Sequence, residues 1–166
     1  IEGFDPRGPR VDSTDPLDRW IRAELARMVD SVTKSMDDYV LFEASKAITE
    51  FVDGLSNWYL RRSRSRFWAG GDVTSGALST LYDVLVELTK VIAPFVPFLA
   101  DALHTRLVPD AKSVHLADWP EASPISANDA ELQQKMALVR ELASLGLGAR
   151  AYVGVRVRQP LRAAEV

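Results

Sequence analysis

The chain has 166 residues and a formal net charge of −3, and its 47% hydrophobic and 26% charged residues are typical of one globular domain. It has no cysteine and only two histidines, which excludes a disulfide framework, a thiolate metal site and a site built mainly of imidazoles. No window has the roughly 18 apolar residues of a membrane span, and the first residues lack a signal-peptide pattern. We therefore expect a cytoplasmic protein with no membrane partner. Because the sequence begins with Ile and has no closing signal, we also expect a piece of a longer polypeptide.

Capping residues and apolar spacing predict two long helices in the first 64 residues. Asp15 is a favourable N-cap, and Pro16 suits the first helical position. Apolar residues at spacings of three and four then form a stripe of Leu17, Ile21, Leu25, Met28 and Val32. The same spacing predicts a second helix from about Tyr39 to about Arg64, on the order of 35 to 40 Å long. Gly54 weakens this helix slightly.

Two further helices are predicted on either side of a proline-containing turn. After the segment AGGD, Thr74 or Ser75 is expected to cap a third helix. Its buried row is predicted to be Leu78, Leu81, Leu85, Leu88 and Ile92. Pro94 and Pro97 should end this helix, because proline lacks the amide hydrogen and clashes with the preceding turn. A fourth helix then has a predicted apolar face of Phe98, Leu99, Ala102, Leu103 and Leu107.

The last third of the chain is predicted to be less regular. The segment SVHLADWP, residues 113–120, alternates apolar and polar residues and predicts extended chain. A fifth helix is expected to open at Asn128, with Glu131 in a capping-box position, and to end near the tripeptide GLG. The alternation in VGVRVRQPL then predicts a strand whose outer face carries Arg156 and Arg158.

These elements predict an all-α fold, an up-and-down bundle of about five helices with a short extended segment and a strand-like C-terminal tail. We expect residues 1–14 to form a lead-in segment. Residues 15–150 should form the helical domain, with an extended connector at about 112–127. Residues 151–166 should be the truncated start of a further region.

The segment SNWYLRRSRSRFWAGGD concentrates four arginines among aromatic residues in an otherwise acidic chain. The arginines are Arg61, Arg62, Arg64 and Arg66. A guanidinium matches phosphate oxygens bidentately, and neighbouring rings can stack on unpaired bases, so the segment is suited to structured RNA. The alternative is a solvated helix end whose arginines complement the helix dipole, with Trp58 in the core by its spacing. The remaining sequence shows no acid/base pair and no phosphate-binding loop, and His104 is interpreted as structural, so we predict no catalytic residue and no metal ligand.

Four segments carry a family resemblance. FVDGLSNWYLRRSRSRFW, residues 51–68, resembles the anticodon-binding domain of isoleucyl-tRNA synthetase. LTKVIAPFVPFLADALHTRL, residues 88–107, is similar to a segment shared by the isoleucyl, valyl and leucyl enzymes. SVHLADWP and VRVRQPL again resemble the isoleucyl family, whereas Gly54 departs from it, because an aspartate is expected there.

The resemblance implies a module that holds the anticodon stem-loop of tRNA(Ile), so that a catalytic domain absent from this chain can attach isoleucine with ATP. The implied tRNA-binding residues are Asn57, Arg61, Arg62, Arg64, Arg66 and Trp68. The other implied partners are the catalytic and editing domains of the same parent chain, and no DNA is expected. ATP and Mg, with Zn as a further possibility, would bind the full-length parent and not this chain. The alternatives are the same domain of a valyl or leucyl enzyme, or an unrelated helical protein-interaction module.

Overall fold

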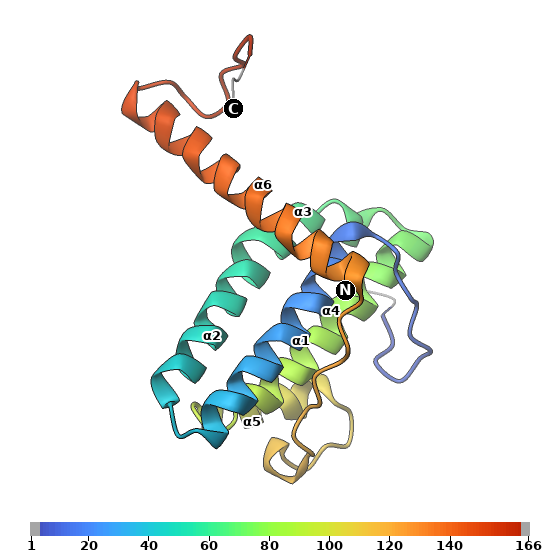
Figure 1. Ribbon diagram of the computed structural model, residues 1–166. Helices are drawn as coiled ribbons and strands as arrows, with labels where there is room; N and C mark the ends of the chain where they lie inside the picture. Colours follow the sequence, from blue (N-terminus) through green and yellow to red (C-terminus); the bar gives the residue numbers. More distant parts are fainter. Residues whose placement is uncertain (1–3, 164–166) are drawn as a thin grey trace.

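The computed structural model describes residues 4–163, which are helical or irregular and contain no strand (Figure 1). The elements are α1 (Pro16–Asp37), α2 (Leu41–Asp53), the π-helix η1 (Gly54–Leu60), α3 (Arg61–Ser63), the 3-10 turn η2 (Arg66–Trp68), α4 (Gly71–Ile92), α5 (Pro97–Leu107), the 3-10 turn η3 (Val114–Leu116) and α6 (Ala127–Tyr152). The prediction of an all-α helical bundle is confirmed. Helix α6 crosses one end of the bundle obliquely, and its C-terminal half projects beyond it (Figure 1).

Helix α1 forms the centre of the bundle and packs against α2, α4 and α6. Its predicted stripe faces the core: Ile21, Met28 and Val32 are buried, and Trp20 beside them is only 1% exposed. The partners that close this core are Phe51, Leu55, Tyr59, Val84, Leu88 and Val91. Removing these side chains from water is the main driving force for assembling the bundle.

The predicted second helix is one continuous helical path made of α2, η1 and α3. Its middle section, which begins at Gly54, is π-helical. A π-turn accommodates an extra residue and therefore rotates the following side chains relative to an α-helix. Propensity and spacing gave no signal for this section beyond the single glycine.

The observed helix ends correct two predicted caps. Helix α4 begins at Gly71, where Gly70 adopts a φ of 86° that favours glycine. Thr74 does not cap α4: its hydroxyl accepts a hydrogen bond from the Gly70 amide and donates one to the Arg66 carbonyl, both at 2.8 Å. In α6 the N-cap is Ser126, whose hydroxyl accepts from the Asp129 amide. Helix α6 also continues past GLG to Tyr152, because each helical glycine costs only about 1 kcal/mol.

The predicted apolar face of α5 is wrong. Phe98 is 90% exposed and Leu99 and Leu103 are exposed as well, whereas Ala100 and His104 are buried. The small Ala100 side chain packs with Ala93 and Val114, so α5 lies close to the end of α4 and to the turn η3. The His104 Nδ1 lies 2.8 Å from the Thr89 hydroxyl, which confirms the structural interpretation of this histidine.

The connector and the tail follow the prediction only in part. Backbone angles are extended at Ser113 and Ala117, but the turn η3 lies between them, and the Trp119 indole donates to the Thr33 hydroxyl at 2.9 Å. The predicted strand-like tail is wrong, since residues 153–163 form turns and irregular chain. A single strand has no neighbour to complete its backbone hydrogen bonds. Instead, the Arg150 guanidinium donates to three carbonyl groups of the tail.

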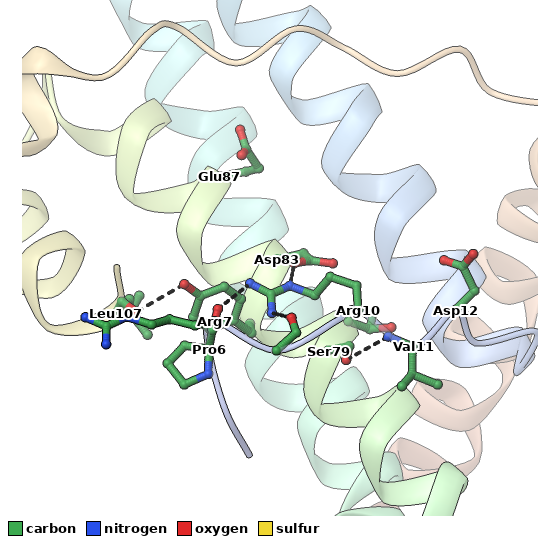
Figure 2. A network of polar contacts seen from close by, with 12 residues as sticks. Pro6, Arg7, Arg10, Val11, Asp12, Ser79, Asp83, Glu87 and Leu107 are labelled. Atoms are coloured by element: carbon green, nitrogen blue, oxygen red, sulfur yellow. Dashed lines mark hydrogen bonds and ion pairs between the residues drawn. The ribbon is translucent and has the colours of Figure 1, made fainter. Parts of the chain in front are cut away.

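The described part of the lead-in segment crosses α4 and is fastened to it (Figure 2). The Arg10 guanidinium donates to the Asp83 carboxylate at 2.9 Å and lies 4.3 Å from the centre of the Tyr82 ring. The Val11 amide donates to the Ser79 hydroxyl at 3.3 Å. These contacts fix the approach to α1. None of the helices in residues 4–163 has the length and apolar character needed to cross a membrane.

Candidate nucleic-acid interface

Three of the predicted arginines are exposed on α3 and on the turn that follows it. Arg61, Arg62 and Arg64 are all solvent-accessible, and no carboxylate among residues 4–163 forms an ion pair with them. Their neighbour Asn57 is exposed as well, and its amide donates to the Asp53 carboxylate at 2.7 Å. The helical path therefore delivers three uncompensated positive charges to one end of the bundle.

Trp58 connects this arginine segment to α6. Its ring is half-buried against the core, and its indole N–H points at the Met136 sulfur, 3.1 Å away. The Arg62 guanidinium lies over the same ring, 4.9 Å from its centre. The expectation that Trp58 belongs to the core is thus confirmed for one edge of the ring. The ring face that Arg62 covers orients this guanidinium through a cation–π contact.

A groove of about 960 Å³ separates the arginine segment from the projecting half of α6. One wall carries Asn57, Arg61 and Arg62, and the other carries Arg140 and Arg150. The one carboxylate among the lining residues, Asp53, lies 3.4 Å from Arg140. The groove is therefore strongly positive, which attracts phosphate groups.

Sequence reasoning missed the second wall of the groove. Arg140 lies in the middle of α6 and Arg150 lies near its end, and neither belongs to the arginine segment. Only the oblique crossing of α6 brings them opposite Arg61 and Arg62. By contrast, a second hollow of about 510 Å³ between α1 and α2 is lined by three carboxylates, Glu24, Glu50 and Asp53, and by two arginines, Arg27 and Arg140, so it is less suited to an anion.

Arg66 occupies a different environment from the other three arginines. Its side chain is 14% exposed, and its guanidinium makes two hydrogen bonds to the fully buried Asp18 carboxylate of α1, with Nη1 at 3.0 Å from Oδ1 and Nη2 bonded to Oδ2. Asp15 lies 3.4 Å away. The buried Tyr59 hydroxyl donates to Asp18 at 2.7 Å. The charge of Arg66 is therefore balanced inside the domain, and RNA contact by this residue stays a prediction that the geometry does not favour.

The protonation states in this cluster are fixed by its hydrogen bonds. Burial alone would raise the pKa of Asp18, but hydrogen bonds from Arg66, Ser13 and Tyr59 outweigh burial and lower it. Burial and the adjacent carboxylate strongly raise the pKa of Tyr59. The hydrogen bond to Asp18 raises the pKa of Arg66. Asp18 and Arg66 are therefore charged and Tyr59 is neutral at physiological pH.

The remaining predicted site residue, Trp68, lies outside the lining of the groove. Its ring is 75% exposed, whereas the adjacent Phe67 packs against the core. The structure thus brings Asn57, Arg61 and Arg62 together, and places Arg64 and Trp68 nearby on the same turn. Within residues 4–163, no three His, Cys, Asp or Glu side chains are grouped so that they could hold a metal ion.

Comparison with known proteins shows the family to which the chain belongs. A family model described as the anticodon-binding domain of tRNA ligase matches residues 18–165, and the chain belongs to this family. Similar proteins include the Isoleucine--tRNA ligase of Streptomyces avermitilis, 47% identical over 155 residues, and that of Thermobifida fusca, 48% identical over 154 residues; each alignment covers 90% of this chain and 14% of the relative. The Isoleucine--tRNA ligase of Chlamydia trachomatis is 40% identical over 166 residues, which cover 98% of this chain and 16% of the relative. The chain therefore spans about one seventh of the length of these relatives.

Proposed function

We propose that this chain is the tRNA-binding module of an isoleucine--tRNA ligase and holds the anticodon stem-loop of tRNA(Ile). Holding that end of the tRNA positions the acceptor end for reaction in a catalytic domain elsewhere in the parent chain. The observation that carries the proposal is the groove, where Arg61 and Arg62 face Arg140 and Arg150 across about 960 Å³. A space of this size is sufficient for a nucleotide-sized group.

The groove chemistry suits a phosphate backbone with unpaired bases. Each guanidinium can bind two oxygens of one phosphate and keeps its charge at any physiological pH. The ring of Trp58 already orients Arg62, so less side-chain freedom is lost when RNA binds. The exposed ring of Trp68 offers a stacking surface for a base splayed out of the loop.

The proposal includes the other partners that the family resemblance implies. The module works with the catalytic and editing domains of its parent, in the cytoplasm. ATP and Mg, and Zn where the parent uses it, bind those other domains and not residues 1–166. Isothermal calorimetry of the purified chain with MgATP tests this part: we expect no binding heat, and a saturable signal would contradict it.

A titration of fluorescently labelled anticodon stem-loop, followed by anisotropy, tests the main proposal. We expect the tRNA(Ile) stem-loop to bind more tightly than a valine or leucine stem-loop and than a DNA duplex of equal charge. Tighter binding of the valine or leucine stem-loop would assign the chain to a related synthetase. An absence of RNA binding at low salt would contradict the proposal and favour a protein-interaction module.

A further inference from the structure

The cluster of Asp18, Tyr59 and Arg66, which we call the Asp18 network, lies next to the arginine segment but does not line the groove. Asp18 and Tyr59 are fully buried, so neither can touch RNA. Burying the Asp18 carboxylate nevertheless has a large desolvation cost, which is offset only when the carboxylate is paired and its hydrogen bonds are made. Ser13 supplies a further hydrogen bond to Asp18.

The position of the network along the chain indicates its role. Tyr59 precedes Arg61 by two residues, and Arg66 follows Arg64 by two residues. Both therefore bind one carboxylate on α1 from opposite sides of the arginine segment. The segment is thus held at both ends by a single anchor on the central helix.

The arginine segment needs such an anchor because it forms the end of a helical path, and helix ends fray. Helix α3 is the last three residues of the continuous path α2–η1–α3 and is followed by a turn. Phe67 packs against the core and Thr74 binds the Arg66 carbonyl, which fixes the far end of the turn. Apolar packing is non-directional, whereas the bonds to Asp18 also fix the rotation of the segment about its axis.

We propose that Asp18 is a positioning residue for tRNA binding, and that it acts through Tyr59 and Arg66 to present Arg61, Arg62 and Arg64 to the RNA. This inference rests on the proposed function. In this arrangement Arg66 holds the arginine segment to Asp18 and does not bind phosphate. Functional groups held in place before binding lose less conformational entropy when the ligand arrives.

Tyr59→Phe is the mildest test, because it removes one hydroxyl and leaves the Asp18–Arg66 ion pair intact. Asp18→Asn and Arg66→Gln remove the charges one at a time, and their double variant completes a cycle. Thr89→Val is the matched control: it removes a buried hydrogen bond to His104, about 18 Å further along α4 than the Ala77 carbonyl beside Tyr59. Each variant is compared by anticodon stem-loop affinity at a temperature where melting curves show it fully folded.

We expect Tyr59→Phe to weaken binding about two- to tenfold, the range that corresponds to one hydrogen bond. Asp18→Asn and Arg66→Gln should each weaken stem-loop binding about tenfold. The double variant should bind no more weakly than either single variant, because the effects of substitutions within one hydrogen-bond network do not add. Arg66→Lys should recover part of the affinity. Thr89→Val should bind as the wild type does, even if it melts at a lower temperature.

Amide hydrogen exchange in the free protein provides a readout that does not depend on RNA. The amides of Trp68 and Ala69 donate to carbonyls within the turn, and the Gly70 amide donates to the Thr74 hydroxyl of α4, so their exchange reports the order of the turn. It should accelerate in Tyr59→Phe and Asp18→Asn relative to the amides of α1, and should not do so in Thr89→Val.

Three outcomes would overturn the inference. One is a folded Tyr59→Phe or Asp18→Asn variant with wild-type affinity and wild-type exchange in the turn. Another is an Arg66→Gln effect that adds in full to that of Asp18→Asn, which would make Arg66 a direct RNA contact. Both leave the proposed function standing if the wild type binds the stem-loop. A wild-type chain that does not bind RNA would overturn the proposed function, and this inference with it.

Discussion

The dependence of stem-loop affinity on salt should report how many arginines touch phosphate. Each phosphate contact releases condensed counterions, so the logarithm of the binding constant falls linearly with the logarithm of salt concentration. Four clustered arginines are present in the sequence, but Arg66 is paired with Asp18, which leaves Arg61, Arg62 and Arg64. Three contacts at roughly 0.7 to 0.9 each give a slope contribution of about 2 to 3.

This slope contribution corresponds to a loss of affinity of about 20- to 40-fold between 50 and 200 mM salt. Anisotropy titrations over that range measure it. Replacing Arg61, Arg62 or Arg64 singly by alanine should lower the slope by about 0.7 to 0.9, and the triple variant should lose the whole contribution. Arg106→Ala is the matched control, since Arg106 is exposed on α5 and does not line the groove. A folded triple variant that keeps the wild-type slope and affinity would show that the segment is only a solvated helix end.

Three further predictions concern stability and stacking. Trp20→Ala should destabilise the fold by about 3 to 5 kcal/mol, whereas Trp68→Ala should change it by less than about 0.5 kcal/mol yet weaken stem-loop binding by about 1 to 3 kcal/mol; equal losses of stability in urea unfolding would contradict the assigned burial. The folded-state pKa of Asp18 lies below 3.8, the ordinary value for an aspartate. The ionised Asp18 therefore contributes fully to folding stability above pH 3.8, and this contribution is lost as the pH falls through the folded-state pKa. Asp18→Asn should therefore be less stable than the wild type at pH 5 to 7, by about 3 kcal/mol, and the gap should narrow below pH 3.8; a constant gap would refute this. Burial and the nearby Lys90 charge lower the pKa of His104, so the unfolded chain binds a proton first and the wild type should lose stability as pH falls below 6.5. His104→Asn should lose less stability than the wild type between pH 7 and 5, and an equal loss would show that His104 is not responsible.

The helices themselves could largely be predicted from local patterns. Apolar spacing and the Asp15 cap identify α1, and the prolines mark the break between α4 and α5, because both signals act within a few residues. Cap residues were harder to choose where several candidates adjoin, as with Ser126 and Asn128. The tail failed as a predicted strand because alternation indicates a strand only where a neighbour can pair with it.

Only one wall of the groove could be predicted from the sequence. The arginine motif is contiguous in sequence, so Arg61 and Arg62 were found, but Arg140 reaches the groove through the crossing angle of a helix some 80 residues later. The role of Arg66 could not be read from the motif either. Its partner Asp18 is 48 positions away and, in the sequence, is indistinguishable from an acidic residue that complements a helix dipole.

The most direct measurement of the central claim is a two-dimensional amide NMR titration of the ¹⁵N-labelled chain with the tRNA(Ile) anticodon stem-loop. If the groove binds the RNA, the largest shift changes should fall in two separate stretches, residues 57–64 and residues 140–150, which line its opposite walls. The amide signals of α5, including those of Phe98 and Leu99, should not shift, although the side chains of these two residues are exposed. Shifts concentrated on α5, or confined to one wall of the groove, would contradict the account.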